Sequence, residues 1–204
     1  MKNARERESR AIELTQFEAA LARVVSAPTT LRPFVCDGSP PDCESFIVGA
    51  NAATVMGDFW DFWHSGIGMD KATWFEAYKA DRAQQPLRAG KTRRLALSPT
   101  RRNIDLVVEG ASPFRCLETN VFSVASSTTA LLKPADRTTA VFEFLLQTIK
   151  PRVVLAHGAE GPDAVRGLDI PASVELVPHL SRGWSGERAR QLGERLRMQL
   201  CTAA

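Results

Sequence analysis

Four short, mainly apolar runs alternate along the chain with longer segments of helical periodicity. The runs are SFIVG at 45–49, FRCLET at 114–119, RVVLA at 152–156 and VELVP at 174–178. Near-continuous apolar runs of this length are typical of strands that are buried on both faces. Their alternation with helices favours parallel pairing through crossover helices. The pattern therefore predicts a three-layer α/β/α sandwich with a central four-stranded parallel sheet.

The segments around these runs carry the expected helices. They cover residues 1–25, which are highly charged, 71–83 after the cap Asp70, a segment from Pro99 after the cap Ser98, 136–149, 162–167, and a final segment that Ser185 caps. Caps, proline in the first turn and apolar residues at three- and four-residue steps are the signals used. The stretch 26–42 is proline-rich and is expected to be irregular. No boundary divides the 204 residues, so we expect a single domain.

Composition adds mainly exclusions. The chain is 44% hydrophobic and 24% charged, as in ordinary globular proteins. No apolar run approaches the ~18 residues that span a membrane, and the amino terminus is too polar for a secretory signal. We therefore expect a cytoplasmic protein without a membrane partner. The four cysteines are scattered and the three histidines lie far apart, so reduced thiols, no metal and no cofactor are expected.

The net charge is only +3, but the basic residues are unevenly distributed. One stretch, 82–102, contains no acid and holds seven basic residues: Arg82, Arg88, Lys91, Arg93, Arg94, Arg101 and Arg102. Such a patch is suited to binding the phosphates of a nucleic acid. The same pattern is also typical of a solvated loop and helix face, and both interpretations stay open.

A polar residue comes at or just beyond the end of each apolar run. These residues are Asn51, Asn120, His157 and His179. A single asparagine at a strand end is more often a turn former, and a single histidine is more often structural. In open parallel sheets, however, ligands bind beyond the carboxyl ends of the strands. Four such groups together favour a shared site.

Three motifs of the chain resemble those of the uracil-DNA glycosylase superfamily. FIVGANAA (46–53) resembles the first motif, an apolar strand followed by Gly-x-Asn/Asp. LETNVF (117–122) is similar to the second strand, whose terminal Asn reads the base, and VPHLSRGWS (177–185) to the last motif, His-x-Ser followed by a loop that enters the DNA. The aromatic FWDFW (59–63) fits the segment that supplies a ring to stack on the flipped base. The resemblance implies DNA with a modified or deaminated base as the partner.

The resemblance also implies roles for the matched residues. Asn51 would position the attacking water, Asn120 would hydrogen-bond the pyrimidine edge, and His179 would stabilise charge on the departing base. The other expected base-site residues are Gly49, Ala50, Ala53, one ring among Phe59, Trp60, Phe62 and Trp63, and His157, which is otherwise a helix-capping residue. Ser181 would bind a phosphate and Arg182, Gly183, Trp184 and Ser185 would fill the gap in the DNA, with Arg93 and Arg94 as further DNA contacts. At least two of the four rings are expected to pack in the core.

The chain departs from the family pattern at several positions. Ala52 stands where the first motif has proline, so the loop geometry is expected to differ. Ala53 stands where the strictest uracil enzymes have a tyrosine that excludes the thymine methyl, which implies relaxed specificity toward bulkier bases. Asn51 in place of aspartate occurs in the mismatch-specific and single-strand-selective branches. The last motif lacks its prolines and is one residue longer, and the cysteine spacing does not match the iron–sulfur branches.

Cleavage of an N-glycosidic bond puts positive charge on the sugar and negative charge on the base, so positioning and electrostatics lower much of the barrier. The leading prediction is a monofunctional DNA glycosylase that acts on uracil or a related deaminated or damaged base. One alternative is a non-catalytic DNA- or base-binding member of the superfamily. Another alternative is an enzyme that acts on small nucleosides or nucleotides. The basic stretch argues mildly against it, because a mononucleotide needs fewer phosphate contacts than a DNA strand. The chain has neither the GxGxxG of dinucleotide-binding folds nor the GxSxG of nucleophile-elbow hydrolases.

Overall fold

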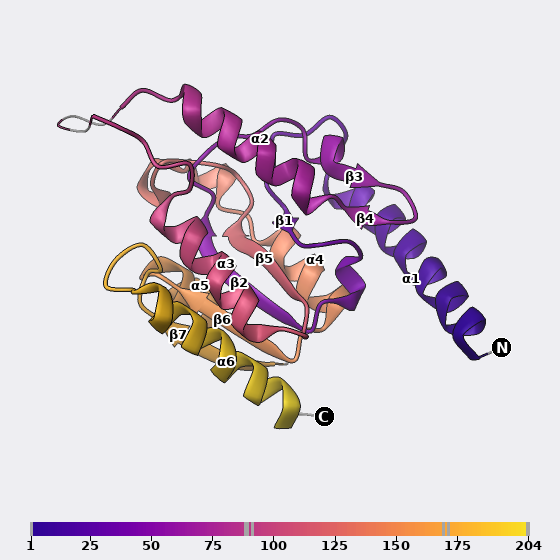
Figure 1. Ribbon diagram of the computed structural model, residues 1–204. Helices are drawn as coiled ribbons and strands as arrows, with labels where there is room; N and C mark the ends of the chain where they lie inside the picture. Colours follow the sequence, from indigo (N-terminus) through magenta and orange to yellow (C-terminus); the bar gives the residue numbers. More distant parts are fainter. Residues whose placement is uncertain (1, 88–89, 91, 169, 171, 203–204) are drawn as a thin grey trace.

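A five-stranded sheet forms the centre of this α/β protein, described here from a computed structural model (Figure 1). The structure describes residues 2–87, 90, 92–168, 170 and 172–202. The strands in spatial order are β1 (Phe34–Val35), β5 (Cys116–Phe122), β2 (Ser45–Asn51), β6 (Val153–His157) and β7 (Ser173–Val177). β1 is antiparallel to β5, and the other neighbours are parallel. A separate antiparallel pair, β3 (Trp63–His64) and β4 (Gly68–Met69), follows the 3-10 helix η2 (Phe59–Phe62).

The four predicted strands are present and mutually parallel, but the sheet has one strand more than predicted. The additional strand, β1, comes from the stretch 26–42, which was expected to be irregular. It pairs with Thr119 and Glu118 of β5 and is too short to show an alternating pattern in the sequence. β2 and β5 also run further than expected, so Asn51 and Asn120 lie within their strands. The sheet is therefore mostly parallel, with an antiparallel edge.

Most of the expected helices are found near their predicted positions. The helices of the described residues are α1 (Lys2–Val24), α2 (Lys71–Gln84), α3 (Pro99–Ala111), α4 (Ala140–Ile149), α5 (Glu160–Arg166) and α6 (Gly186–Thr202). Asp70 and Ser98 cap α2 and α3, and their side-chain oxygens accept hydrogen bonds from the N–H groups of Thr73 and Arg101 at 2.9 and 3.1 Å. α4 begins later than the expected residue 136, because Pro134–Asp136 form a separate 3-10 turn.

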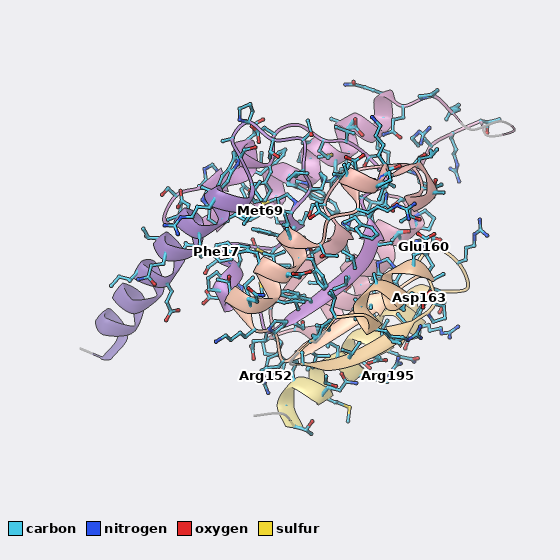
Figure 2. All side chains as sticks on the ribbon, turned by 180° about the vertical axis from the view of Figure 1, so that it is seen from behind. Phe17, Met69, Arg152, Glu160, Asp163 and Arg195 are labelled. Atoms are coloured by element: carbon cyan, nitrogen blue, oxygen red, sulfur yellow. The ribbon has the colours of Figure 1, made fainter. Side chains whose placement is uncertain are left out.

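Helices lie on both faces of the sheet, and each face has its own buried cluster. On β2, Phe46 and Val48 belong to the larger cluster, with side chains of α1, α4 and α5, whereas Ile47 belongs to the cluster under α3 and α6. Phe17 of α1 and Met69 of β4 also lie in the larger cluster (Figure 2). Alternate residues of a strand point to opposite faces. Burial on both sides explains why β2, β5 and β6 read as nearly continuous apolar runs. The run at 174–178 was wrongly expected to be buried in the same way: β7 is an edge strand and is largely exposed.

The helices α3 and α6 pack against each other at very close range. A Cβ at Gly193 of α6 would lie 2.1 Å from the carbonyl oxygen of Val107 and 2.9 Å from the Cα of Gly110, both on α3. Only glycine allows the two backbones to approach so closely. This contact fixes the position of α3, whose amino end borders the candidate site described below.

No helix of the described residues is long and apolar enough to cross a membrane. The four cysteines are free thiols; three are buried and Cys201 is exposed. Within the described part of the chain, no three His, Cys, Asp or Glu side chains gather as a metal site requires.

Candidate functional site

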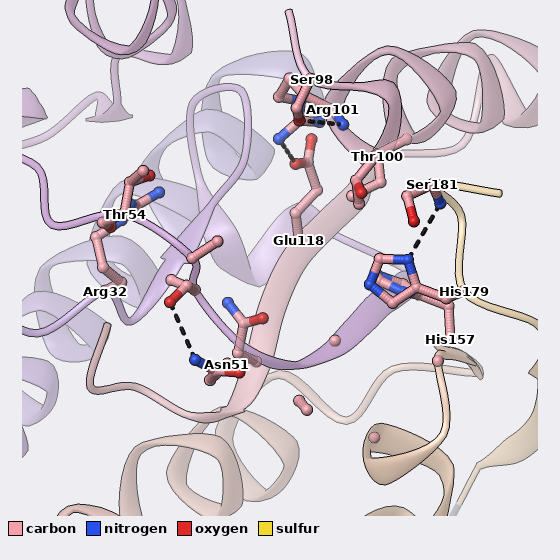
Figure 3. Close-up of a pocket in the computed structure, with 18 of the residues that line it drawn as sticks. Arg32, Asn51, Thr54, Ser98, Thr100, Arg101, Glu118, His157, His179 and Ser181 are labelled. Atoms are coloured by element: carbon pink, nitrogen blue, oxygen red, sulfur yellow. Dashed lines mark hydrogen bonds and ion pairs between the residues drawn. The ribbon is translucent and has the colours of Figure 1, made fainter. Parts of the chain in front are cut away.

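A cavity of about 1020 Å³ opens at the carboxyl ends of the parallel strands (Figure 3). The ends of β2, β5 and β6 line it together with the amino end of α3 and the loop after β7. The structure brings the four strand-end residues together there: Asn51, Asn120, His157 and His179. Because this edge of a parallel sheet is where open α/β folds bind ligands, the cavity is the candidate functional site.

Gly49 of β2 lies at the centre of this group and leaves room for two of its side chains. Gly49 pairs with Asn120 in the register of β2 and β5. A Cβ at Gly49 would lie 2.7 Å from Oδ1 of Asn120 and 3.4 Å from Cε1 and Nε2 of His157. The missing side chain therefore lets the Asn120 amide and the His157 imidazole approach each other over β2.

The His179 ring is held in a defined tautomer. Its Nδ1 accepts a hydrogen bond of 3.1 Å from the backbone N–H of Ser181. In a neutral imidazole the other nitrogen then carries the proton, so Nε2–H is a donor. Partial burial, and next the positive charge of Arg182, lower the pKa of His179. At neutral pH the residue is therefore an uncharged hydrogen-bond donor at the cavity.

His157 is a second neutral imidazole beside the first. Its ring meets that of His179 edge to face, with centroids 5.3 Å apart and an interplanar angle of 86°. Burial, then the neighbouring His179 and Arg101, lower the pKa of His157 to about 3. Its buried Nδ1 has no hydrogen-bond partner among the described residues. The sequence left a base contact and helix capping open for His157, and the structure places it in the cavity wall.

The amide of Asn51 is oriented by two backbone carbonyls. Its Nδ2 donates to the carbonyl oxygens of Ser126 at 2.6 Å and Ala52 at 3.2 Å. Both acceptors are carbonyls, so the nitrogen side of the amide must face them. Among the described residues, no donor bonds to its Oδ1. That oxygen is free to accept a hydrogen bond from a water or a ligand.

A buried charged network borders the cavity at β5. Glu118 forms ion pairs with Arg101 of α3 and, at 2.7 Å, with Lys71 of α2. Arg101 also pairs with Asp105 at 2.8 Å. Burial alone raises the pKa of Glu118, but the two cations outweigh it and lower that pKa to about 2. The Glu118 carboxylate thus joins α2 and α3 to the sheet.

None of the four rings of the FWDFW segment lines the cavity. Phe59, Phe62 and Trp63 are buried in the larger cluster, and Trp60 donates its Nε1–H to the carbonyl oxygen of Ser26 at 3.1 Å. The structure therefore does not bring the expected stacking ring to the site. The segment packs against α1, where Trp63 stacks on Phe17 with centroids 6.1 Å apart.

Two aromatic residues outside the FWDFW segment do line the cavity. Trp74 and Tyr78 lie one turn apart on α2, and their rings stack with centroids 5.6 Å apart and an interplanar angle of 18°. The Tyr78 hydroxyl donates to Oγ of Ser98 at 3.1 Å. Their four-residue spacing was visible in the sequence, but nothing in it indicated which side of the helix meets the cavity.

The residues expected to contact DNA divide into two groups. The first group lines the cavity and consists of Ser181, Arg182 and Arg94. The expected base-site residues Gly49, Ala50 and Ala53 line it as well. Those that do not line it are Arg93, Gly183, Trp184 and Ser185. Ser185 caps α6 by accepting from the N–H of Arg188 at 3.1 Å, and the Arg188 guanidinium lies 4.7 Å from the centroid of Trp184. Of the basic stretch, Arg88 and Lys91 lie outside the described residues.

No protein-family model matches the chain, and no curated protein matches it.

Proposed function

We propose that this protein is a monofunctional DNA glycosylase that hydrolyses the N-glycosidic bond of uracil or a related deaminated or damaged base in DNA. The observation that carries the proposal is the His179 donor. Its Nε2–H is fixed by the Ser181 hydrogen bond in a cavity that also holds the Asn120 amide and the free Oδ1 of Asn51. The three residues to which the motif resemblance assigns the chemistry thus line one cavity.

The proposed reaction needs a donor for the departing base and a position for water. As the bond between C1′ and the base nitrogen breaks, its electron pair goes to the base, and negative charge develops on the base oxygens. The Nε2–H of His179 stabilises that charge as a preorganised, uncharged donor. Oδ1 of Asn51 accepts a hydrogen bond from the water that adds to C1′. The hydroxyl of that water stays on the sugar, and its proton ends on the released base.

Asn120 suits the reading of a base edge, because a side-chain amide offers a donor and an acceptor side by side. Ala53 leaves the cavity wall open where a larger side chain would restrict it, in keeping with the relaxed specificity that the sequence predicts. A base inside a duplex must leave the stack to reach such a pocket. We also infer that the parallel strands form the middle layer of a three-layer α/β/α sandwich, because buried clusters under helices lie on both faces of the sheet.

The proposal is tested with labelled oligonucleotides that carry uracil, hypoxanthine, xanthine or hydroxymethyluracil, followed by alkali to cut abasic sites. The wild type is expected to cleave at least one of them. Asn51→Ala, Asn120→Ala and His179→Ala are expected to abolish that cleavage, while Ser65→Ala, exposed and far from the cavity, leaves it intact. DNA binding without cleavage of any substrate would favour the non-catalytic alternative. Activity on free nucleosides alone would favour the small-molecule alternative.

A further inference from the structure

The cavity has a second polar side that the proposed base site does not use. Arg32, which precedes β1, lies across the cavity from His179 (Figure 3). Its backbone N–H donates to the carbonyl oxygen of Ser123 at 2.8 Å, and its Nη1 donates to that of Thr54 at 2.6 Å. These hydrogen bonds hold Arg32 against the loop that follows β5 and against the loop that follows Asn51.

An aromatic ring holds the Arg32 guanidinium in place. Its Cζ lies 5.5 Å from the centroid of Trp74, and Cζ of Arg101 lies 5.7 Å from the same ring. Both distances fall within the range of cation–π attraction. Arg32 is therefore preorganised before any ligand arrives.

The charge of Arg32 is not balanced by a neighbouring acid. Arg101 has Glu118 and Asp105 as ion-pair partners, but no carboxylate lies within 4 Å of the Arg32 guanidinium among the described residues. Burial, and then the charge of Arg101, lower the pKa of Arg32 to about 10, against weaker opposing effects that include Asp81. A guanidinium has five N–H donors, and burial of an unpaired charge is costly. The site therefore favours an anionic ligand.

Arg82 and Arg94 also line this cavity and carry unpaired charge. Arg82 donates its Nε–H to the carbonyl oxygen of Leu95 at 2.8 Å, and Arg94 donates to that of Pro86. Neither has a carboxylate within ion-pair distance in the described part of the chain, and the buried Nε of Arg94 has no partner there. Three arginines from separate segments thus line one cavity without acidic partners.

We propose that Arg32 binds a phosphate group of the same nucleotide whose base enters the site between Asn120 and His179. This inference rests on the proposed function and assigns the substrate a charged group at a defined place. The planar guanidinium matches a phosphate with two parallel hydrogen bonds. Thr54, which anchors Arg32, follows Asn51 by three residues and so lies at most about 11 Å from it. The phosphate is either a phosphodiester of a DNA strand or the phosphate of a free nucleotide.

The first test measures binding of a short single-stranded oligonucleotide that carries a tetrahydrofuran abasic analogue, so that no base is needed. Arg32→Gln is expected to weaken binding about tenfold. It is also expected to reduce the slope of log affinity against log salt by about 0.7. Arg32→Lys keeps the charge but loses the planar set of guanidinium donors. Its affinity is expected to lie between that of the wild type and that of Arg32→Gln. Arg23→Gln, on an exposed position of α1, matches the wild type.

Uncharged methylphosphonates, placed one linkage at a time, identify the phosphate. In the wild type one linkage beside the abasic position is expected to be sensitive, and Arg32→Gln is expected to lose that sensitivity. Equal affinity, salt slope and linkage sensitivity in both proteins would overturn the inference. If Arg32→Gln does not fold, only the affinity of Arg32→Lys is compared with that of the wild type, because lysine keeps the charge that sets the salt slope; equal affinity would then overturn the inference.

A second arm separates this inference from the proposed function. If the wild type binds no oligonucleotide, the glycosylase proposal fails, and inorganic phosphate is then titrated against chloride at equal ionic strength. The readout is the side-chain Nε–H resonance of Arg32, assigned by its absence in Arg32→Lys. A shift with phosphate alone would make a free nucleotide the source of the group. No shift would overturn the phosphate site as well.

Discussion

The imidazole rings of His157 and His179 meet edge to face at the carboxyl edge of the sheet, with centroids 5.3 Å apart. Burial is the main cause that lowers the pKa of each ring; the charges of His179 and Arg101 add to it for His157, and the charge of Arg182 adds to it for His179. The pair is therefore neutral at physiological pH. His179 is therefore expected to stabilise the departing base as an uncharged donor and not as a cation.

The depressed pKa of His157 predicts a loss of stability in mild acid. Its ordinary pKa of 6.5 falls to about 3 in the folded state, so between these values the unfolded chain binds more protons. This contribution to stability is present above pH 6.5 and is lost as the pH falls. Between pH 7 and pH 5 the wild type should lose about 2 kcal/mol more than His157→Gln. Urea unfolding at both pH values measures this, and equal losses in the two proteins would contradict it.

Gly49→Ala should impair catalysis more than folding. A Cβ there would lie 2.7 Å from Oδ1 of Asn120, so the Asn120 amide has to move aside. A misplacement of about 1 Å can cost about 100-fold in rate, whereas the end of a side chain yields at little cost in stability. Turnover and thermal unfolding are measured together. Gly57→Ala is the matched control, because its Cβ would lie 3.6 Å from the nearest atom, Oδ2 of Asp61. Unchanged turnover in Gly49→Ala would show that the position of Asn120 does not matter.

Asn51→Asp is expected to lower activity, although an aspartate activates water more strongly than an amide does. Nδ2 of Asn51 donates to the carbonyl oxygens of Ser126 and Ala52 at 2.6 and 3.2 Å. A carboxylate oxygen in its place would face two carbonyl oxygens with no proton between them, and the loop would shift. The initial cleavage rate near pH 7 is the measurement. A faster enzyme would indicate that the amide contacts are dispensable and that water activation limits the rate.

Glu118→Gln should be strongly destabilising, by about 3 kcal/mol or more, because it leaves Arg101 and Lys71 buried without their common partner. Asp163→Asn removes an exposed ion pair with Arg166 and should cost less than about 1 kcal/mol. Denaturant unfolding compares the two variants. Since the folded pKa of Glu118 is about 2, its stabilising effect is complete above pH 4.5 and is lost as the pH falls toward 2. A small effect of Glu118→Gln at pH 7 would contradict the network.

The sequence predicted the parts of the fold that local pattern determines. β2, β5 and β6 are buried and so read as apolar runs, and the caps of α2 and α3 are local hydrogen bonds. β1 could not be predicted, because two residues show no period and its pairing with β5 joins segments more than 80 residues apart. The strand-end residues were predicted because parallel topology alone places them at one edge of the sheet.

Other parts of the site depend on packing that local pattern does not contain. The FWDFW rings and the pair Trp74 and Tyr78 are equally apolar in sequence, but only the latter line the cavity. In the sequence, Arg32 is an isolated basic residue of a proline-rich stretch. It lies beside Trp74 because β1, which follows it, pairs antiparallel with β5. The partners of Glu118 likewise come from α2 and α3, far away along the chain.

The most direct test of the central claim is the mass of the reaction products. An oligonucleotide with a single uracil, or with whichever base the panel identifies, is incubated with the protein and analysed by mass spectrometry. The wild type is expected to yield an intact strand that has lost the base and gained one hydroxyl, together with the free base, whereas neither Asn51→Ala nor His179→Ala yields these products. Strands of unchanged mass for every substrate, or products that persist undiminished in both variants, would contradict it.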